Sequence, residues 1–264
     1  MRRRRISQSF FLLAAAGTSF IAVGACGDTR STFEGERIFN EENDSGTGTD
    51  SQTCGFQCSI DGRNIVDTCT GDVVETCPQE LACGGARCQE PCAAAAADRS
   101  SNGCEFYFQM PRFTRVFAQS CYATFIVNTS TLPLEVSLDI EGKTLDVSSA
   151  MYRTEPGSAD LVKHTGPIAA GESAILFVAD RDPELPRPSG ERERVGCPIG
   201  VVPAIYLESP LPHGTGIGTA FHLKTNVPAG ITAMYPFGGA ASLVPSATLL
   251  SPVATWAKEN IIVN

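Results

Sequence analysis

The chain has 264 residues, and its 29 acidic side chains outnumber its 20 lysines and arginines, which gives a formal net charge of −9. Nucleic acids repel an acidic protein, and so do anionic lipid surfaces, so the composition excludes both as partners of the chain's surface. The stretch ERERVG at 191–196 alternates in sign and predicts a solvated loop.

The N-terminal residues have the pattern of a secretion signal. Arg2–Arg5 precede an apolar run from Phe10 to Val23, which is too short to cross roughly 30 Å of bilayer hydrocarbon as a lasting helix. The sequence VGAC at 23–26 resembles the lipobox of bacterial lipoproteins, in which a peptidase cuts before the cysteine and its sulfur is acylated. We predict a signal peptide at 1–25 and lipidation of Cys26. The alternative is an ordinary signal peptide with an incidental cysteine.

Residues 26–53 are predicted to be a disordered acidic tether behind the lipid. They hold two arginines against seven acids, which are Asp28, Glu34, Glu36, Glu41, Glu42, Asp44 and Asp50. A segment so poor in apolar side chains cannot bury enough surface to offset its ordering entropy. Its expected r.m.s. reach of about 30 Å would hold the rest of the chain off a membrane.

The chain has eleven cysteines, of which ten remain after the predicted anchor. Export places them in an oxidising compartment, where paired cysteines persist. We therefore predict structural disulfides, with pairing left open, among Cys54, Cys58, Cys69, Cys77, Cys83, Cys88, Cys92, Cys104, Cys121 and Cys197. Zinc is the rival explanation, but the uneven spacing of the first seven lacks paired C-x2-C knuckles. Cys121 and Cys197 are isolated from the dense group and are predicted to bridge to each other.

A cysteine-rich module is predicted at 54–103. This segment has few large apolar side chains, so its core alone cannot stabilise it and it needs disulfides. Thr70, Gly71 and Asp72 are predicted to form a turn between two short strands, and Ala93–Ala97 one or two helical turns.

Residues 104–264 have the pattern of a β domain. In LEVSLDI at 134–140, apolar and polar side chains alternate with a period of two, and Glu141 and Gly142 then predict a hairpin turn into KTLDVS at 143–148. Further strands are predicted at 122–128, 172–179, 204–209, 219–225, 230–237, 247–252 and 260–264. The fold class is therefore mainly β, a disulfide-rich module followed by an antiparallel sandwich or jelly-roll-like domain. The chain ends on an apolar strand pattern, so we expect the native polypeptide to continue past Asn264.

The candidate sites in this domain each have a structural explanation that we prefer. A phosphate-binding loop needs a helix directly after its glycines, but a strand pattern follows Gly214, Gly216 and Gly218. We therefore predict a glycine-rich turn or bulge there. The separations of His164, His213 and His222 match no local zinc pattern, and His222 is expected to be half buried in a strand. Asp180 and Asp182 are expected to be solvated in a charged loop. The aromatic side chains of Phe106, Tyr107, Phe108 and Phe113 are expected to fill the core, with an exposed binding strip as the alternative.

Several stretches together resemble the bacterial branch of the IgGFc-binding protein N-terminal domain family. They are NIVDTCTGDVVETCP, SSNGCEFYF, HGTGIGTAFHLKTNVP, ITAMYPFGGAAS and SATLLSPVATW, spread over residues 54–264. The resemblance implies an exported or lipidated protein with a cysteine-rich piece before a β-rich domain that continues past Asn264. It carries over no catalytic residue, and immunoglobulin binding does not follow from it.

These patterns predict a non-catalytic cell-envelope lipoprotein that presents a binding or adhesion domain, in the outer membrane or at the surface of a Gram-negative bacterium. No catalytic, metal or cofactor-binding residue is predicted. The expected partners are the membrane, through the lipid, and an unidentified protein or glycan, with no nucleic acid. A structural envelope component is the first alternative, and a secreted hydrolase is the second.

Overall fold

The computed structural model describes residues 54–111, 119–155, 157–158, 160–186, 194–207, 219–238 and 246–256. These described residues all fall within one compact unit. The predictions for residues 1–53, Phe113, His213, the three glycines at 214–218 and the strand at 260–264 lie outside the described residues.

The cysteine-rich part consists of two small antiparallel sheets and a helix. β1 (Phe56–Cys58), β2 (Asn64–Asp67) and β3 (Val73–Thr76) form the first sheet, and β4 (Ala82–Gly84) and β5 (Arg87–Gln89) form the second. The predicted turn at 70–72 joins β2 to β3, and Gly71 supplies a positive φ of 76° there. The buried apolar cluster is only Ile65, Cys77 and Cys83, which is why this part depends on its disulfides.

The predicted helical turns form α1 (Pro91–Asp98). Glu90 caps it, because its Oε2 accepts a hydrogen bond from the Ala93 backbone N–H at 2.9 Å, and Pro91 fits the first turn, where no donor is needed. The helix ends at Arg99, whose φ of 48° is left-handed.

The backbone of α1 packs directly on Gly84 of β4. A Cβ atom at residue 84 would lie 2.4 Å from both Cα and the carbonyl oxygen of Ala94. We expect Gly84→Ala to lower the free energy of unfolding by about 1–3 kcal/mol, because the helix would have to move away from β4. Urea unfolding of the oxidised protein measures this. The control is Gly55→Ala, which adds a methyl group where no atom lies within 4 Å; equal stability of the two variants would contradict the packing.

All ten cysteines of the described residues form disulfides. The pairs are Cys54–Cys69, Cys58–Cys83, Cys77–Cys88, Cys92–Cys104 and Cys121–Cys197. The predicted bridge between Cys121 and Cys197 is confirmed. Cys92–Cys104 joins α1 to the first strand of the large sheet, so the two regions of the chain are covalently linked across the predicted boundary at 103.

The mainly β architecture is confirmed by a ten-stranded, curled sheet whose pairs are antiparallel except for β12–β13. Its central path runs β11-β10-β12-β7-β14-β8-β9, with β13 beside β12 and with β6 and β15 beside β14. The strands are β6 (Gly103–Phe108), β7 (Tyr122–Asn128), β8 (Val136–Ile140), β9 (Lys143–Leu145), β10 (Met151–Thr154), β11 (Leu161–Lys163), β12 (Ser173–Arg181), β13 (Ile205–Leu207), β14 (Phe221–Tyr235) and β15 (Ser246–Leu249). The short 3-10 helix η2 (Val253–Thr255) follows β15.

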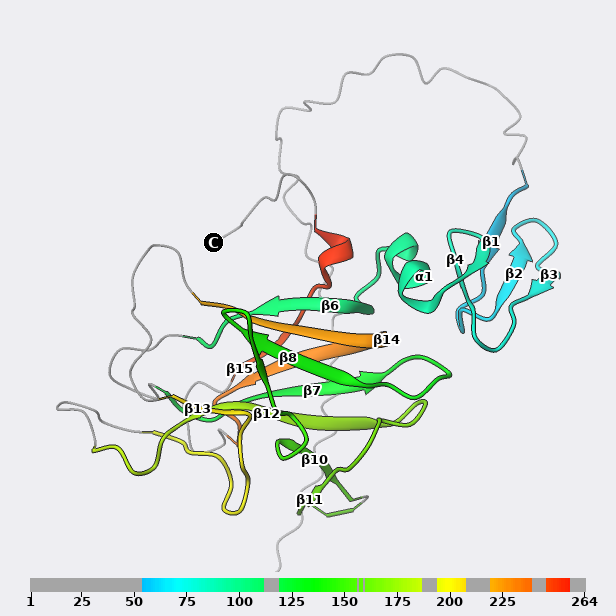
Figure 1. Cartoon of the computed structure of the whole chain (residues 1–264). Helices are drawn as coiled ribbons and strands as arrows, with labels where there is room; N and C mark the ends of the chain where they lie inside the picture. The colour runs from blue at the N-terminus through cyan, green and yellow to red at the C-terminus, as the bar shows by residue number, and fades with distance from the viewer. Residues whose placement is uncertain are drawn as a thin grey trace, which may run out of the picture. The chain divides into compact units, whose positions relative to one another are not determined.

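One long strand connects the two parts of this sheet. β14 pairs with β6 and β8 through residues 221–225 and then with β7 and β15 through 229–235, as Figure 1 shows. Its pairing with β6 is interrupted between Lys224 and Ala229, and Pro228, which has no N–H to donate, lies in that interruption. The strands predicted at 219–225 and 230–237 correspond to these two paired segments, which belong to one element, β14.

The main apolar core lies on one face of the curled sheet. It contains Phe106 and Phe108 of β6, Leu138 of β8, Leu176 of β12 and Leu223 of β14. A second cluster includes Ala123 of β7, Phe177 of β12 and Cys121, which immediately precedes β7, and Cys197 packs against it. The predicted hairpin from β8 to β9 is confirmed, with Glu141 and Gly142 at positive φ in its turn.

Candidate binding face on the large sheet

Three neighbouring strands present a polar and aromatic face to solvent. The strand register aligns Tyr107, His222 and Asp139 in one row across β6, β14 and β8, and Glu105, Lys224 and Ser137 in the next. These six side chains alternate with the buried Phe106, Leu223 and Leu138, because successive residues of a strand point to opposite sides of the sheet. We call these six residues, together with Trp256, the β6–β14–β8 face.

His222 lies between two carboxylates. Its Nε2 is 2.8 Å from Oε1 of Glu105, its Nδ1 is 3.0 Å from Oδ2 of Asp139, and its side chain is 12% exposed. The Glu105 contact is a hydrogen bond, and the Asp139 contact is a close approach of nitrogen and oxygen. His222 therefore links the carboxylates of β6 and β8 across β14.

Two aromatic rings extend this cluster into solvent. The Tyr107 ring stacks on His222 with centroids 4.2 Å apart and planes 2° from parallel. The Trp256 ring lies 5.9 Å from Tyr107 at 49°, and its Nε1 donates to the Ser251 carbonyl at 3.3 Å. Tyr107 is 42% exposed and Trp256 is 53% exposed. Exposed aromatic rings that are held in place are the side chains most enriched at binding hot spots.

The predicted aromatic strip is therefore divided between core and surface. Phe106 and Phe108 fill the core as expected, whereas Tyr107 belongs to the exposed face. His222 is half buried, as predicted. Glu105 and Trp256 were not identified from the sequence, because their proximity to His222 depends on strand pairing between segments far apart in the chain.

Asp180 differs from its prediction. It lies near the end of β12 with 6% exposure, and its carboxylate accepts hydrogen bonds from Arg194 Nη2 at 2.5 Å and from the Cys197 backbone N–H at 2.8 Å. A charged carboxylate can be buried only with such partners. The prediction of a solvated Asp180 was wrong; the side chain instead holds residues 194–197 against β12.

The pKa of the nearby Tyr206 phenol is raised, mainly by burial and then by the negative charges of Asp180 and Asp182.

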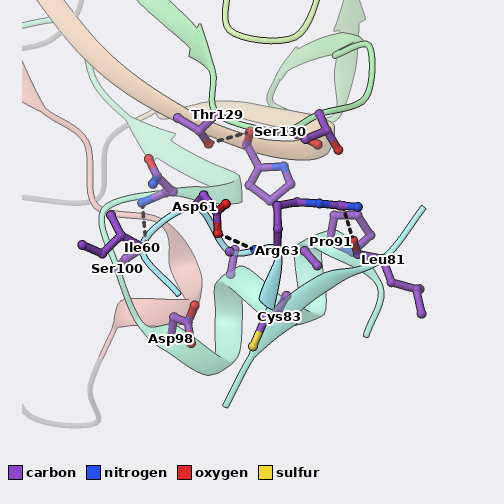
Figure 2. A pocket seen from close by; sticks show the side chains of 17 residues that line it. Ile60, Asp61, Arg63, Leu81, Cys83, Pro91, Asp98, Ser100, Thr129 and Ser130 are labelled. Atoms are coloured by element: carbon purple, nitrogen blue, oxygen red, sulfur yellow. Dashed lines mark hydrogen bonds between the residues drawn. The ribbon is translucent and has the colours of Figure 1, made fainter. Parts of the chain in front are cut away.

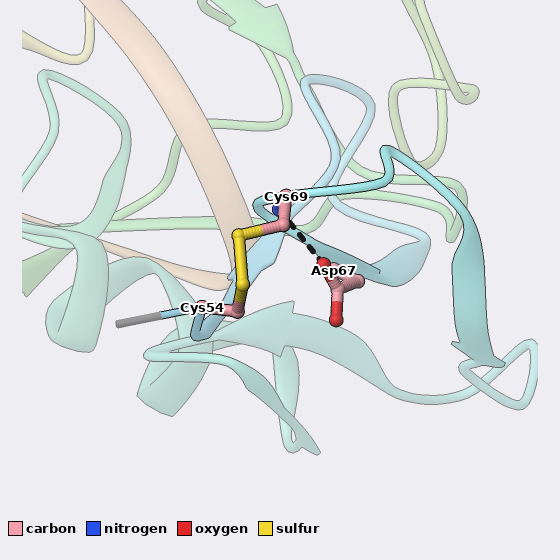
Figure 3. A group of neighbouring side chains, drawn as sticks. All are labelled: Cys54, Asp67 and Cys69. Atoms are coloured by element: carbon pink, nitrogen blue, oxygen red, sulfur yellow. Dashed lines mark hydrogen bonds between the residues drawn. A yellow bond between two sulfur atoms is a disulfide. The ribbon is translucent and has the colours of Figure 1, made fainter. Parts of the chain in front are cut away.

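One group of potential metal ligands in the described residues lies at a turn that a disulfide closes. Figure 3 shows Cys54, Asp67 and Cys69, which could each offer one ligand atom within 4.8 Å of the others. The two sulfurs are bonded to each other at 2.02 Å and have no thiolate to offer. Asp67 Oδ1 accepts hydrogen bonds from the backbone N–H groups of Cys69 and Thr70 at 2.7 and 3.0 Å, as in an Asx turn.

Two pockets lie among the described residues, and the second includes Ser137 of the β6–β14–β8 face. The pocket in Figure 2, of about 260 Å³, is lined by Arg63, whose guanidinium donates to the carbonyls of Leu81 and Cys77, and by Thr129, whose hydroxyl donates to the Pro228 carbonyl. Its polar groups therefore bind the chain itself. The second pocket, of about 500 Å³, is lined mainly by apolar side chains of the β8–β9 region and by His164.

His164 and His222 form no shared metal-ligand group in the described part of the chain. None of the helices in that part is long and apolar enough to cross a membrane. Comparisons with family models, curated proteins and solved structures found no match for this chain.

Proposed function

We propose that the protein is an exported lipoprotein of the cell envelope that uses the β6–β14–β8 face to bind a ligand outside the cell, without catalysing a reaction. The observation that carries the proposal is the exposed pair Tyr107 and Trp256 beside the Glu105–His222–Asp139 cluster. A rigid, partly exposed aromatic pair with charged neighbours is suited to recognition.

The disulfides of the fold support the exported location. Five disulfides persist in an oxidising compartment and are rare in the reducing cytosol. Lipidation of Cys26 would hold the protein on the outer membrane or cell surface, and residues 26–53 would act as the tether. The resemblance to the bacterial IgGFc-binding branch is part of this proposal and supplies no ligand.

The rigidity of the face also supports a binding role. Its central strand β14 is hydrogen-bonded on both sides, to β6 and to β8, and the disulfide of Cys104 lies next to Glu105. A surface that is ordered before the ligand arrives loses little conformational entropy on binding.

Adherence of whole cells tests the proposal. Bacteria that express the full chain would be compared with bacteria that express Tyr107→Ala/Trp256→Ala on surfaces coated with mucin, collagen or peptidoglycan. We expect the wild-type chain to raise adherence several-fold on at least one coating and the double variant to abolish that gain. Equal adherence of the two strains on every coating would support a structural envelope component instead.

A further inference from the structure

We infer that the ligand of the β6–β14–β8 face is a carbohydrate, an oligosaccharide whose pyranose rings stack on Trp256 and Tyr107 while their hydroxyl groups bond to Glu105 and Asp139. This inference rests on the proposed binding function and names the ligand class of the same site.

The first argument is the shape of the exposed apolar surface. The open ring surface belongs to Trp256 and Tyr107, whose planes are tilted by 49°. The negative face of an aromatic ring attracts weakly positive C–H groups. A pyranose ring with equatorial hydroxyls has C–H groups on its flat faces and hydroxyls around its rim, so it can stack on such a ring without losing its polar contacts.

The second argument is the unused hydrogen-bonding capacity beside the rings. Glu105 contacts His222 through its Oε1 atom, and Asp139 contacts His222 through its Oδ2 atom. The side chain of Glu105 remains 42% exposed, and that of Asp139 remains 33% exposed. Within the described residues, Oε2 of Glu105 and Oδ1 of Asp139 form no hydrogen bond. Hydroxyl groups donate strongly to carboxylates, and Lys224 in the neighbouring row adds a donor for ring or hydroxyl oxygens.

The third argument is the local charge. The two carboxylates share His222 between them, and Lys224 lies beside Glu105 in the next row, so the face is not a cluster of unpaired acids. An aromatic pair beside uncompensated acids would favour a cationic ligand. Here His222 already stacks on Tyr107 and occupies one oxygen of each acid, which leaves a neutral, hydroxyl-rich ligand as the better match.

The tryptophan content of the chain allows a direct test, because Trp256 is the only tryptophan in the sequence. The full chain, purified in a sugar-free detergent, would be titrated with cellohexaose and with chitohexaose while tryptophan fluorescence is recorded. We expect a saturable change with at least one of the two oligosaccharides. Tyr107→Ala should weaken the apparent affinity at least about tenfold, as loss of a hot-spot ring does.

Two further variants make the titration specific. Tyr206→Ala removes a tyrosine that is 40% exposed on β13, outside the face, and should leave the titration unchanged. Glu105→Gln keeps the shape of the side chain and removes its charge, and should also weaken binding. No saturable change with either oligosaccharide, or an equal affinity in Tyr107→Ala and the wild type, would overturn the inference.

Competition with soluble oligosaccharide separates this inference from the proposed function. Excess cellohexaose or chitohexaose would be added to the adherence assay, because a soluble sugar competes for the face whatever the linkage chemistry of the coating. Loss of the Tyr107- and Trp256-dependent adherence supports a carbohydrate ligand. Adherence that still depends on both rings in an excess of both oligosaccharides would show that the face binds something other than sugar, while the binding function itself would stand.

Discussion

Removal of the Cys121–Cys197 disulfide is expected to lower the free energy of unfolding by about 4 kcal/mol. The two cysteines are 76 residues apart, and closing a loop of that length in the unfolded chain removes about this much conformational entropy. Cys121 is also fully buried in the second apolar cluster, so the substitutions remove packing as well. Urea unfolding of Cys121→Ala/Cys197→Ala, followed by circular dichroism, measures the loss.

The matched control for this variant is Cys54→Ala/Cys69→Ala. That disulfide spans only 15 residues, and both of its cysteines are exposed, so the expected loss is smaller, about 3 kcal/mol. If the Cys121/Cys197 variant proved as stable as the wild type, or more stable than the control, the bridge would not be the staple of the β domain that the structure indicates.

Phe106→Ala is the second substitution with a large expected effect, about 3–5 kcal/mol of unfolding free energy. Phe106 is 0% exposed and is among the largest fully buried side chains of the main core, so its removal leaves a cavity that the sheet cannot fill. Thermal unfolding of the oxidised protein would show the loss as a lower melting temperature.

Tyr107→Ala is the control, because it changes the next residue of the same strand. Its side chain lies on the solvent side, where we expect a loss of less than about 1 kcal/mol from the contacts with His222 and Trp256. The contrast tests the orientation of β6, on which the binding face depends. A larger loss in Tyr107→Ala than in Phe106→Ala would mean that the strand faces the other way.

Local patterns in the sequence predicted much of the fold. The prediction of a strand at 122–128 agrees with the bounds of β7, and the alternation in 134–140 identified the buried Leu134 and Leu138 correctly. A period of two can be read from neighbouring residues alone, because it reflects which face of a strand is buried.

The remaining features depend on contacts between distant segments. Pro228 and Gly230 ordinarily indicate the end of a strand, yet β14 continues through them because its pairing changes from β8 to β7 there. Asp180 lies in a stretch rich in charge and proline, and its burial depends on Arg194 and the Cys197 N–H, which only the fold brings to it.

The candidate binding face has the same dependence on tertiary structure. His222 was singled out from the sequence, but Glu105 lies 117 residues before it and no local motif joins the two. Only the strand register of β6, β14 and β8 places both carboxylates and both rings around one histidine.

The most direct test of the account is the chemical state of residue 26 in the native protein. Mass spectrometry of the membrane fraction after trypsin digestion should find a peptide of residues 26–30 that begins at Cys26 and carries a thioether-linked diacylglycerol, because Arg30 is the first trypsin site after the predicted cleavage. Cys26→Ala should remove that peptide and release the protein from the membrane fraction. An unmodified Cys26, or a Cys26→Ala protein that fractionates as the wild type does, would contradict the account.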